Sequence, residues 1–236
     1  MNKRNFKVII LCGGLGSRLS EETKKIPKPM VRIGNDPILI HIINIFVKYG
    51  FKDFILALGY KKEKIIKFFK KKKINNVNIK LIDTGKNTLT GSRLLKLKKY
   101  LNNENFLLTY GDGLSNININ KLINFHLKNK KVATITAVRP PARFGELFLK
   151  KNIVKKFQEK NQINAGWING GFFVFNKKIF EFIPKKSCML EKDPMINLTK
   201  KKQLIAYKHN SFWQCMDTLR DKELLNKIWK SGKSKW

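Results

Sequence analysis

The sequence has few acidic residues, few cysteines and no long hydrophobic run, and each shortage excludes a class of protein. Its three cysteines lie far apart and include no Cys-x-x-Cys pair, which excludes a disulfide scaffold and argues against a structural zinc site. Apolar runs such as residues 8–11 fall far short of the roughly 20 residues that a membrane-spanning helix needs. The first residues show no signal-peptide pattern. We therefore expect a globular cytoplasmic protein with no membrane partner.

The shortage of acid leaves a formal net charge of +34, from 50 Lys and Arg against 16 Asp and Glu. Such an excess is typical of proteins that bind nucleic acid. Here the excess is mostly lysine in a chain that is also rich in Asn and Ile, as a codon bias toward A and T would produce. Lysine runs at 70–73, 96–99 and 200–202 lie beside apolar helical stripes, as solvated faces do. We do not expect a nucleic-acid partner, although a cationic surface favours phosphorylated small substrates.

The 236 residues, 42% of them hydrophobic, are enough to bury the core of one domain. Up to residue 140, short apolar runs alternate with segments of helical periodicity. Strands are predicted at 6–11, 53–58, 77–82, 106–110 and 132–138, and helices at 37–49, 62–73, 92–101 and 120–128. This alternation predicts an α/β fold, a mostly parallel mixed sheet with helices on both faces.

After residue 140 the predicted strands are shorter and fewer helices separate them. Strands are predicted at 144–149, 153–159, 170–175 and 203–209, and helices at 176–183, 193–201 and 218–229. No linker or repeat interrupts the chain, so we expect this half to extend the same sheet. A ligand in such a fold binds outside the carboxyl ends of the strands.

The strongest local motif is a glycine loop that directly follows the first predicted strand. It reads Leu11-Cys12-Gly13-Gly14-Leu15-Gly16-Ser17-Arg18-Leu19. Three glycines allow backbone N–H groups to approach a phosphate, and Arg18 can pair with phosphate oxygens. The loop is neither a P-loop, since no Gly-Lys-Ser/Thr closes it, nor a dinucleotide fingerprint, since Leu19 takes the place of the third glycine. It predicts a phosphate site of another kind.

Three further residues suit a site for phosphate and metal. Lys28 stands between Pro27 and Pro29, which restrict its backbone and make it a well-placed phosphate ligand. Asp112 and Asp217 each follow an apolar run, and two carboxylates with several waters are the usual way to hold Mg²⁺ on nucleotide phosphates. Either aspartate could instead cap a helix. The histidines and cysteines form no catalytic pattern.

Motifs in the same order along nearly the whole chain resemble those of the sugar-1-phosphate nucleotidyltransferases, and among these the glucose-1-phosphate cytidylyltransferases. The general signature is the glycine loop followed by Pro27-Lys28-Pro29-Met30. The more specific motifs are Asp83-Thr84-Gly85, Leu89-Thr90-Gly91-Ser92-Arg93-Leu94, Thr109-Tyr110-Gly111-Asp112-Gly113, Phe157-Gln158-Glu159-Lys160, Trp167-Ile168-Asn169-Gly170-Gly171 and Met216-Asp217-Thr218-Leu219-Arg220-Asp221.

The resemblance implies a Rossmann-like nucleotidyltransferase fold in a single domain, with a nucleotide-binding half at 1–140 and a sugar-binding half with a C-terminal helix at 141–236. It implies that CTP and α-D-glucose 1-phosphate give CDP-glucose and pyrophosphate with Mg²⁺ as cofactor. It also implies a homo-oligomer and a place in the synthesis of nucleotide sugars for surface polysaccharide, such as lipopolysaccharide O-antigen.

The resemblance also implies a role for each residue. The catalytic set is Arg18, Lys28, Asp112, Asp217 and Lys160, with Asp112 and Asp217 on the metal. The nucleotide set is Leu11, Cys12, Gly13, Gly14, Leu15, Gly16, Ser17, Arg18, Lys28, Thr84, Thr90, Gly91, Ser92, Arg93 and Gly111, with Thr84 and residues 90–93 at the cytosine. The sugar-phosphate set is Glu159, Lys160, Asn169 and Gly170.

Two alternatives stay open. The segment at 69–82 is shorter than in the cytidylyltransferases, which favours the same fold with UTP, dTTP or another phosphorylated acceptor. The charge of +34 favours a nucleic-acid-binding protein on an inactive scaffold, but the chain lacks the aromatic-interleaved basic motifs of RNA-binding modules. Intact Arg18, Lys28, Asp112 and Asp217 also argue against an inactive scaffold.

Overall fold

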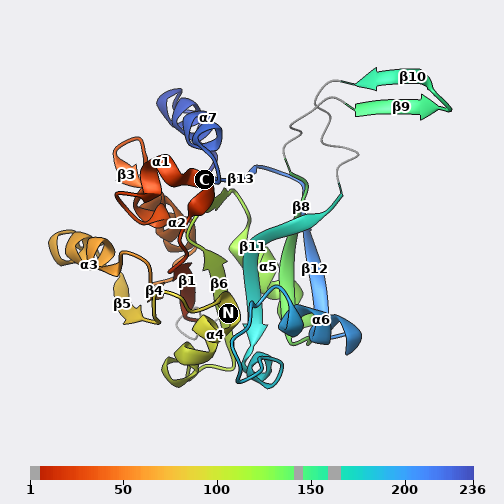
Figure 1. The fold of residues 1–236 in the computed structure, drawn as a ribbon. Coiled ribbons are helices and arrows are strands. Elements are labelled where there is room, and N and C mark those ends of the chain that lie inside the picture. Colours follow the sequence, from red (N-terminus) through yellow and green to blue (C-terminus); the bar gives the residue numbers. More distant parts are fainter. Residues whose placement is uncertain (1–5, 141–145, 159–165) are drawn as a thin grey trace.

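The computed structural model describes residues 6–140, 146–158 and 166–236, and these are built around a seven-stranded sheet with the strand order β12-β8-β11-β6-β1-β4-β5 (Figure 1). The strands are β1 (Val8–Cys12), β4 (Asp53–Leu58), β5 (Asn78–Asp83), β6 (Asn105–Tyr110), β8 (Ala133–Val138), β11 (Ile168–Asn176) and β12 (Leu204–His209). Six strands run in one direction, and only β11 runs against its neighbours β6 and β8. The predicted α/β fold with a mostly parallel mixed sheet is confirmed.

Helices cover both faces of the sheet. They are α1 (Ser20–Thr23), α2 (Ile38–Val47), α3 (Lys62–Lys71), α4 (Thr90–Leu97), α5 (Ile119–Asn129), α6 (Asp193–Lys200) and α7 (Leu219–Lys230). Short 3-10 helices lie at Ser17–Leu19, Lys28–Met30, Lys98–Tyr100 and Lys177–Glu181. The helix predicted at 176–183 is therefore only a 3-10 helix, and it begins where Asn176 accepts the N–H of Lys178.

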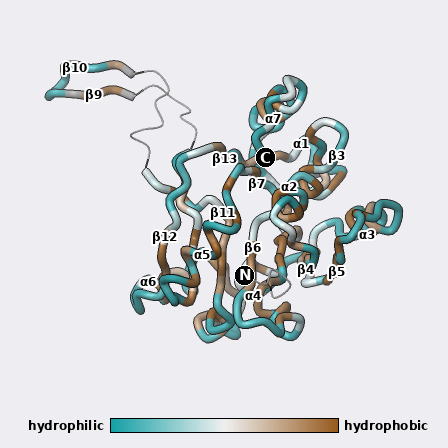
Figure 2. The backbone as a smooth tube through the Cα atoms, turned by 180° about the vertical axis from the view of Figure 1, so that it is seen from behind, coloured by the Kyte–Doolittle hydropathy of each residue, from teal (hydrophilic) through white to brown (hydrophobic). Residues whose placement is uncertain are grey.

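Alternation along β1 divides the core into two apolar clusters, because successive side chains of a strand point to opposite faces. Val8 and Ile10 belong to the cluster that α2 and α5 cover, whereas Ile9 and Leu11 belong to the one that α4 and α6 cover. In β1 all five residues are buried, as expected for a central parallel strand. Hydrophobic segments accordingly concentrate in the sheet, while α7 is largely hydrophilic (Figure 2).

The second half of the chain extends the sheet only in part, which corrects the expectation that all its strands join it. Strands β11 and β12 join, and β11 is inserted between β6 and β8 rather than added at an edge. By contrast, β9 (Glu146–Lys150) and β10 (Ile153–Gln158) pair only with each other, as a hairpin that projects from the sheet (Figure 1). Two further pairs lie apart from the main sheet: β13 (Trp213–Cys215) with β7 (Gly113–Ser115), and β2 (Arg32–Ile33) with β3 (Asp36–Pro37).

One edge of the sheet collects the chain segments that carry polar motifs. Strands β1, β4, β5 and β6 are parallel, so their carboxyl ends lie at the same edge. Because β11 runs in the opposite direction, its amino end, with Asn169, meets the carboxyl end of β8 at that edge. Within the described residues, no helix has both the length and the apolar character needed to cross a membrane.

His126 is a buried polar residue that ties α5 to the sheet. It is 2% exposed, and its ring nitrogens lie 2.8 Å from the Thr134 hydroxyl and 3.2 Å from the Asn105 amide oxygen. Burial lowers the pKa of His126 to about 4. The expectation that it is a core or surface residue rather than a catalytic one agrees with this position.

We expect His126 to make the protein less stable in mild acid. The unfolded chain takes up its proton near pH 6.5 and the folded chain only near pH 4, so stability falls as the pH drops between these values, by about 2 kcal/mol from about pH 7.5 to about pH 5. Urea unfolding at both pH values measures this fall. His126→Asn should lower stability at both and reduce the difference by that amount; an unchanged difference would contradict the assignment.

Candidate functional site

The glycine loop connects β1 to the 3-10 helix Ser17–Leu19, and two of its glycines are required by their surroundings. Gly16 has a φ of 67°, a left-handed conformation that favours glycine. A Cβ on Gly13 would lie 2.1 Å from Nη1 of Arg93, so the guanidinium occupies the space beside this backbone. Gly14, in contrast, borders open space. The loop is therefore packed tightly at both ends and accessible in its middle.

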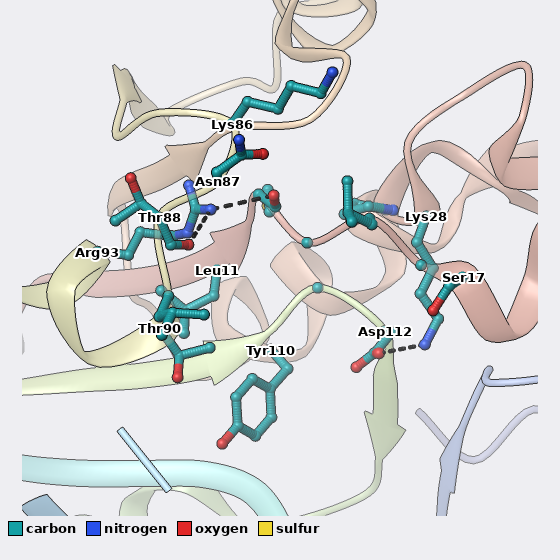
Figure 3. Close-up of a pocket in the computed structure, with 18 of the residues that line it drawn as sticks. Leu11, Ser17, Lys28, Lys86, Asn87, Thr88, Thr90, Arg93, Tyr110 and Asp112 are labelled. Carbon is teal, nitrogen blue, oxygen red and sulfur yellow. Dashed lines mark hydrogen bonds and ion pairs between the residues drawn. The ribbon is translucent and has the colours of Figure 1, made fainter. Parts of the chain in front are cut away.

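A first pocket of about 520 Å³ opens over this loop (Figure 3). Its lining contains every predicted residue from Leu11 to Arg18, together with Lys28, Thr90, Arg93 and Gly111. It also contains Pro29, Leu89 and Tyr110, which stand in the motifs but received no predicted role, and Lys86, Asn87, Thr88 and Met189, which lie outside the motifs. The predicted Thr84, Gly91 and Ser92 are not among the lining residues.

Lys28 joins both aspartates, and Arg18 joins one of them; these four residues are the Lys28 cluster. The Lys28 ammonium lies 2.6 Å from Oδ2 of Asp112 and 2.5 Å from Oδ1 of Asp217. Arg18 lies with Nη1 2.7 Å from Oδ2 of Asp217. Lys28 is 8% exposed and Asp217 is 9% exposed, whereas most of the Arg18 side chain is exposed. Sequence reasoning thus selected four residues that the fold brings together.

Local structure holds each member of this cluster. Lys28, which stands between the two prolines, is the first residue of a 3-10 helix. Pro29 packs close to Gly111, since a Cβ on Gly111 would lie 2.8 Å from Cγ of Pro29. Asp112 follows β6, and its carbonyl accepts the N–H of Met216 at 2.9 Å. This hydrogen bond brings the segment before α7 beside the end of β6.

Asp217 does not cap α7. Thr218 is the N-cap, and it forms a capping box with Asp221. The carboxylate of Asp221 also accepts the backbone N–H of Asp217 at 3.1 Å. With the cap supplied by Thr218, the Asp217 side chain is free to turn to Lys28, so the helix-cap alternative is wrong for this residue.

The charges of the cluster stabilise one another. Burial pushes the pKa of the Asp217 carboxyl upward, but the Lys28 ammonium and the Arg18 guanidinium outweigh burial and hold it below its usual value. Burial likewise pushes the pKa of Lys28 downward, but Asp112 and Asp217 outweigh it and raise that pKa above its usual value. At neutral pH Lys28 is a cation and Asp217 an anion.

The two aspartates also suit a divalent metal. Their oxygens converge on a single cationic atom, the Lys28 nitrogen, so both can contact one cation. Within residues 6–140, 146–158 and 166–236 no group of three or more His, Cys, Asp or Glu could hold a metal. Two protein carboxylates with phosphate oxygens and water are the usual environment of Mg²⁺, which keeps several waters. The donor set therefore fits a metal that is bound together with a phosphorylated ligand.

A second pocket of about 860 Å³ adjoins the first, since Arg18, Tyr110 and Asp112 line both. Its lining includes the predicted Asn169, Gly170 and Asp217, and the unpredicted Glu191 and Trp213. Trp213 donates its indole N–H to the carbonyl of Gly170 at 2.8 Å. The predicted Glu159 and Lys160 lie outside the described residues. Both halves of the chain contribute to both pockets.

Arg93 builds the wall of the first pocket. Its Nη1 donates to the carbonyl of Leu58 at 2.7 Å and to that of Gly85 at 3.1 Å, and also contacts the Thr84 hydroxyl. Its Nη2 donates to the carbonyl of Thr88 at 2.7 Å and to that of Gly13 at 3.2 Å. The guanidinium thus connects the last residue of β4 with the loops after β1 and β5, and Arg93 is 3% exposed. Its terminal N–H groups are committed to the protein, which leaves them little capacity for a nucleobase.

The cysteines beside the site are not poised for nucleophilic chemistry, as expected. Burial raises the pKa of the Cys12 thiol. Burial, reinforced by Asp217, raises the pKa of Cys215 to about 12. Both stay protonated at neutral pH, and a thiol is a poor nucleophile in comparison with a thiolate.

A glycine loop with a carboxylate pair at the carboxyl edge of a mostly parallel sheet defines a protein that handles nucleotide phosphates. The family model described as nucleotidyl transferase matches residues 7–220. The chain belongs to this family, so the resemblance stated from the motifs is confirmed.

Individual relatives agree with this assignment. The chain is 41% identical to "Glucose-1-phosphate cytidylyltransferase" of Salmonella typhimurium, covering 98% of each protein. It is also 41% identical to "Probable glucose-1-phosphate cytidylyltransferase" of Bacillus subtilis, covering 98% of this chain and 99% of that protein. Among solved structures, HddC from Yersinia pseudotuberculosis, complexed with GMP-PN, has a TM-score of 0.76 at 27% identity, covering 95% of this chain and 99% of that one.

We expect Arg93→Lys to destabilise the protein although it keeps the charge. A lysine ammonium has three donors at one point and cannot connect the same three chain segments as a guanidinium. Loss of several buried hydrogen bonds to a charged group should lower the free energy of unfolding by about 2–4 kcal/mol, measured by urea unfolding. The matched control is Arg32→Lys, at an exposed residue whose hydrogen bond to the Asn35 carbonyl is local; equal losses in the two variants would refute the role.

Proposed function

We propose that this chain transfers the cytidylyl group of CTP to α-D-glucose 1-phosphate and forms CDP-glucose and pyrophosphate. The observation that carries the reaction type is the position of the Lys28 cluster where the two pockets adjoin. The choice of nucleotide and sugar rests on the relatives named glucose-1-phosphate cytidylyltransferase, which match almost the whole chain. The alternative with UTP, dTTP or another acceptor is an outcome of the test.

In this proposal the first pocket binds CTP. The backbone N–H groups of the glycine loop and the charges of Arg18 and Lys28 face its phosphates. The base would lie toward Lys86–Thr88 and Thr90, at the opposite end of the first pocket (Figure 3). Arg93 supports this wall from behind through its bonds to the backbone.

The second pocket binds the sugar phosphate in this proposal. Asn169 and Gly170 lie in its lining and would bind sugar hydroxyls, and we assign Glu159 to the sugar and Lys160 to its phosphate from the resemblance. Because Asp112 and Arg18 line both pockets, the acceptor phosphate would stand next to the nucleotide phosphates. Holding two polyanions this close is the main task of the protein.

Nucleotidyltransferases of this family generally use a divalent metal, and we propose Mg²⁺ held by Asp112 and Asp217. When bound, the metal would neutralise the charge that develops on the phosphates. Lys28 now contacts both carboxylates, so we infer that its ammonium moves toward the phosphates when a metal takes over the carboxylates. A homo-oligomeric state and a cytoplasmic location are further parts of the proposal that the resemblance supplies.

The reaction needs no base in the protein. A phosphate oxygen of glucose 1-phosphate is already anionic, so it can attack the α-phosphorus of CTP without giving up a proton. A new phosphorus–oxygen bond forms as the bond to the β-phosphate oxygen breaks, and the electron pair leaves with pyrophosphate. Arg18 and Lys28 stabilise the negative charge that accumulates on the leaving group.

We expect pyrophosphate release with Mg²⁺ and glucose 1-phosphate to occur with CTP and not with UTP, dTTP, ATP or GTP. An enzyme-coupled phosphate assay run with all five nucleotides in parallel measures this. Release with another nucleotide in place of CTP would keep the reaction type and refute the choice of base. No release with any of them would refute the choice of acceptor.

We expect Asp112→Asn to reduce kcat for CDP-glucose formation by at least about 100-fold, since a neutral amide neither holds Mg²⁺ as a carboxylate does nor balances Lys28. The readout beside activity is binding of Mn²⁺ in the presence of CTP, followed by electron paramagnetic resonance, which should weaken in the variant. Asp53→Asn, at the opposite edge of the sheet in the first position of β4, is the control. Retained activity and metal binding in Asp112→Asn would remove Asp112 from the metal.

A further inference from the structure

Glu191 is an acidic residue between the two pockets that none of the predicted roles includes. It stands in the segment before α6 and lines the second pocket. Its Oε2 accepts the hydroxyl of Thr90 at 2.5 Å, and its Oε1 accepts the hydroxyl of Tyr110 at 2.5 Å. Thr90 and Tyr110 both line the first pocket. The carboxylate therefore connects the walls of the two pockets.

The backbone around Glu191 is fixed by α4. The carbonyl of Cys188 accepts the N–H groups of Gly91 and Ser92 at 3.1 and 3.2 Å, in the first turn of that helix. In return the Ser92 hydroxyl accepts the N–H of Cys188 at 2.9 Å, and the Thr90 hydroxyl accepts that of Leu190 at 2.8 Å. These bonds satisfy free donors at a helix N-terminus and hold the segment in one place. Glu191 thus rests on a rigid support.

Tyr110, the second partner of Glu191, is packed so that its hydroxyl oxygen is held in one position. Its ring meets Phe173 edge to face at a centroid distance of 5.8 Å. Gly171, at a φ of 81°, leaves room for the ring, since a Cβ there would lie 2.6 Å from Cδ2 of Tyr110. The amide nitrogen of Asn169 donates to the Tyr110 hydroxyl at 3.2 Å, and the amide oxygen of Asn169 accepts the N–H of Gly171 at 2.8 Å.

The proton of the Tyr110 hydroxyl points to Glu191. Burial, followed by the nearby Glu191 carboxylate, raises the pKa of Tyr110 well above its usual value, so the phenol keeps its proton. A carboxylate only accepts hydrogen bonds, so Tyr110 must be the donor to it. The tyrosine oxygen can then offer only lone pairs to other groups, and one of these accepts from Asn169.

We propose that Glu191 is a positioning residue that fixes Tyr110 as a hydrogen-bond acceptor in the second pocket and thereby selects acceptors with a hydroxyl group at the matching ring position. The inference deepens the proposed function and rests on its assignment of the sugar phosphate to this pocket. The proposal fixes the direction of the hydrogen bond: a hydroxyl of the sugar donates to the remaining lone pair of the Tyr110 oxygen. A sugar that lacks this hydroxyl leaves one lone pair of the Tyr110 oxygen without a donor, and a site built for hydrogen bonding discriminates against such a sugar.

The experiment compares kcat/KM for glucose 1-phosphate with that for its 2-, 3-, 4- and 6-deoxy analogues, at saturating CTP. For the wild type, at least one analogue should be worse by about tenfold or more. In Tyr110→Phe and in Glu191→Ala this penalty should shrink by at least about fivefold, for the same analogue in both. In Glu191→Ala, KM for CTP should change by a smaller factor than the penalty for that analogue does, because the nucleotide keeps its phosphate ligands although Thr90 loses the carboxylate that accepts its hydroxyl.

Two further variants separate positioning from general damage. Glu191→Gln should restore most of the discrimination, because its amide oxygen can still accept from Tyr110 while its nitrogen faces Thr90, whose oxygen can accept. Asp193→Ala, which removes an acidic side chain two residues away at the start of α6, should behave like the wild type. The double variant of Glu191→Ala and Tyr110→Phe should lose no more than about twofold beyond the worse single variant, since both act through one hydroxyl.

Each outcome decides the proposal. Equal treatment of all analogues by the wild type, or an undiminished penalty in Tyr110→Phe, overturns it. The proposal is also overturned if the double variant loses discrimination additively, or if Glu191→Ala impairs the use of CTP as much as that of the sugar phosphate. If Glu191→Ala does not fold, Tyr110→Phe and Glu191→Gln carry the test. Turnover of CTP and glucose 1-phosphate by the wild type and Asp193→Ala reports on the proposed function separately, so failure of one is distinguishable from failure of the other.

Discussion

The ion pairs of Lys28 with Asp112 and Asp217 are the contact on which the site depends. In the sequence, Lys28 lies 84 positions from Asp112 and 189 positions from Asp217. Because both carboxylate oxygens lie within 2.6 Å of one nitrogen, they are no more than about 5 Å apart, and their repulsion would be about 3 kcal/mol at an effective dielectric constant of about 20. The two carboxylates can therefore lie this close only with a cation between them. Two carboxylates that require a cation between them are also suited to a divalent metal.

A second constraint is that four backbone carbonyls converge on Arg93 beside the first pocket. Arg93 satisfies carbonyls from the end of β4 and from the loops after β1 and β5 at once, and buried carbonyls without a partner would be costly. A guanidinium suits this task because it presents several donors in one plane. Burial lowers the pKa of Arg93, partly countered by Cys12 and Asp83, and it remains a cation. Its charge also favours anions over the glycine loop, so one residue supports the wall and contributes to the electrostatics of the pocket.

Much of the fold and part of the site could be predicted from the sequence. Strand and helix periodicity placed every strand of the seven-stranded sheet and the longer helices, since segments such as β1 and α2 are apolar enough to be recognised locally, but it missed the short strands β2, β3 and β7 and the short helix α1. The glycine loop, Lys28 and the aspartates were found because their chemistry is legible in residue type and local context. Arg93 was assigned to the base, since a sequence cannot show that loops from three strands converge on a guanidinium. Glu191 was missed for a similar reason: its partners Thr90 and Tyr110 lie 101 and 81 positions away.

The reversed strand β11 explains why two pockets meet at one edge. In a wholly parallel sheet this edge would receive only carboxyl ends of strands, whereas the antiparallel β11 delivers its amino end, with Asn169, beside the ends of β6 and β8. A bulge between Asn169 and Phe173 then lets Gly171 make room for Tyr110. The second pocket is thus built against the strand that Asp112 follows in the sequence. The two pockets meet at the end of β6, where Tyr110 and Asp112 line both, because the sheet is mixed.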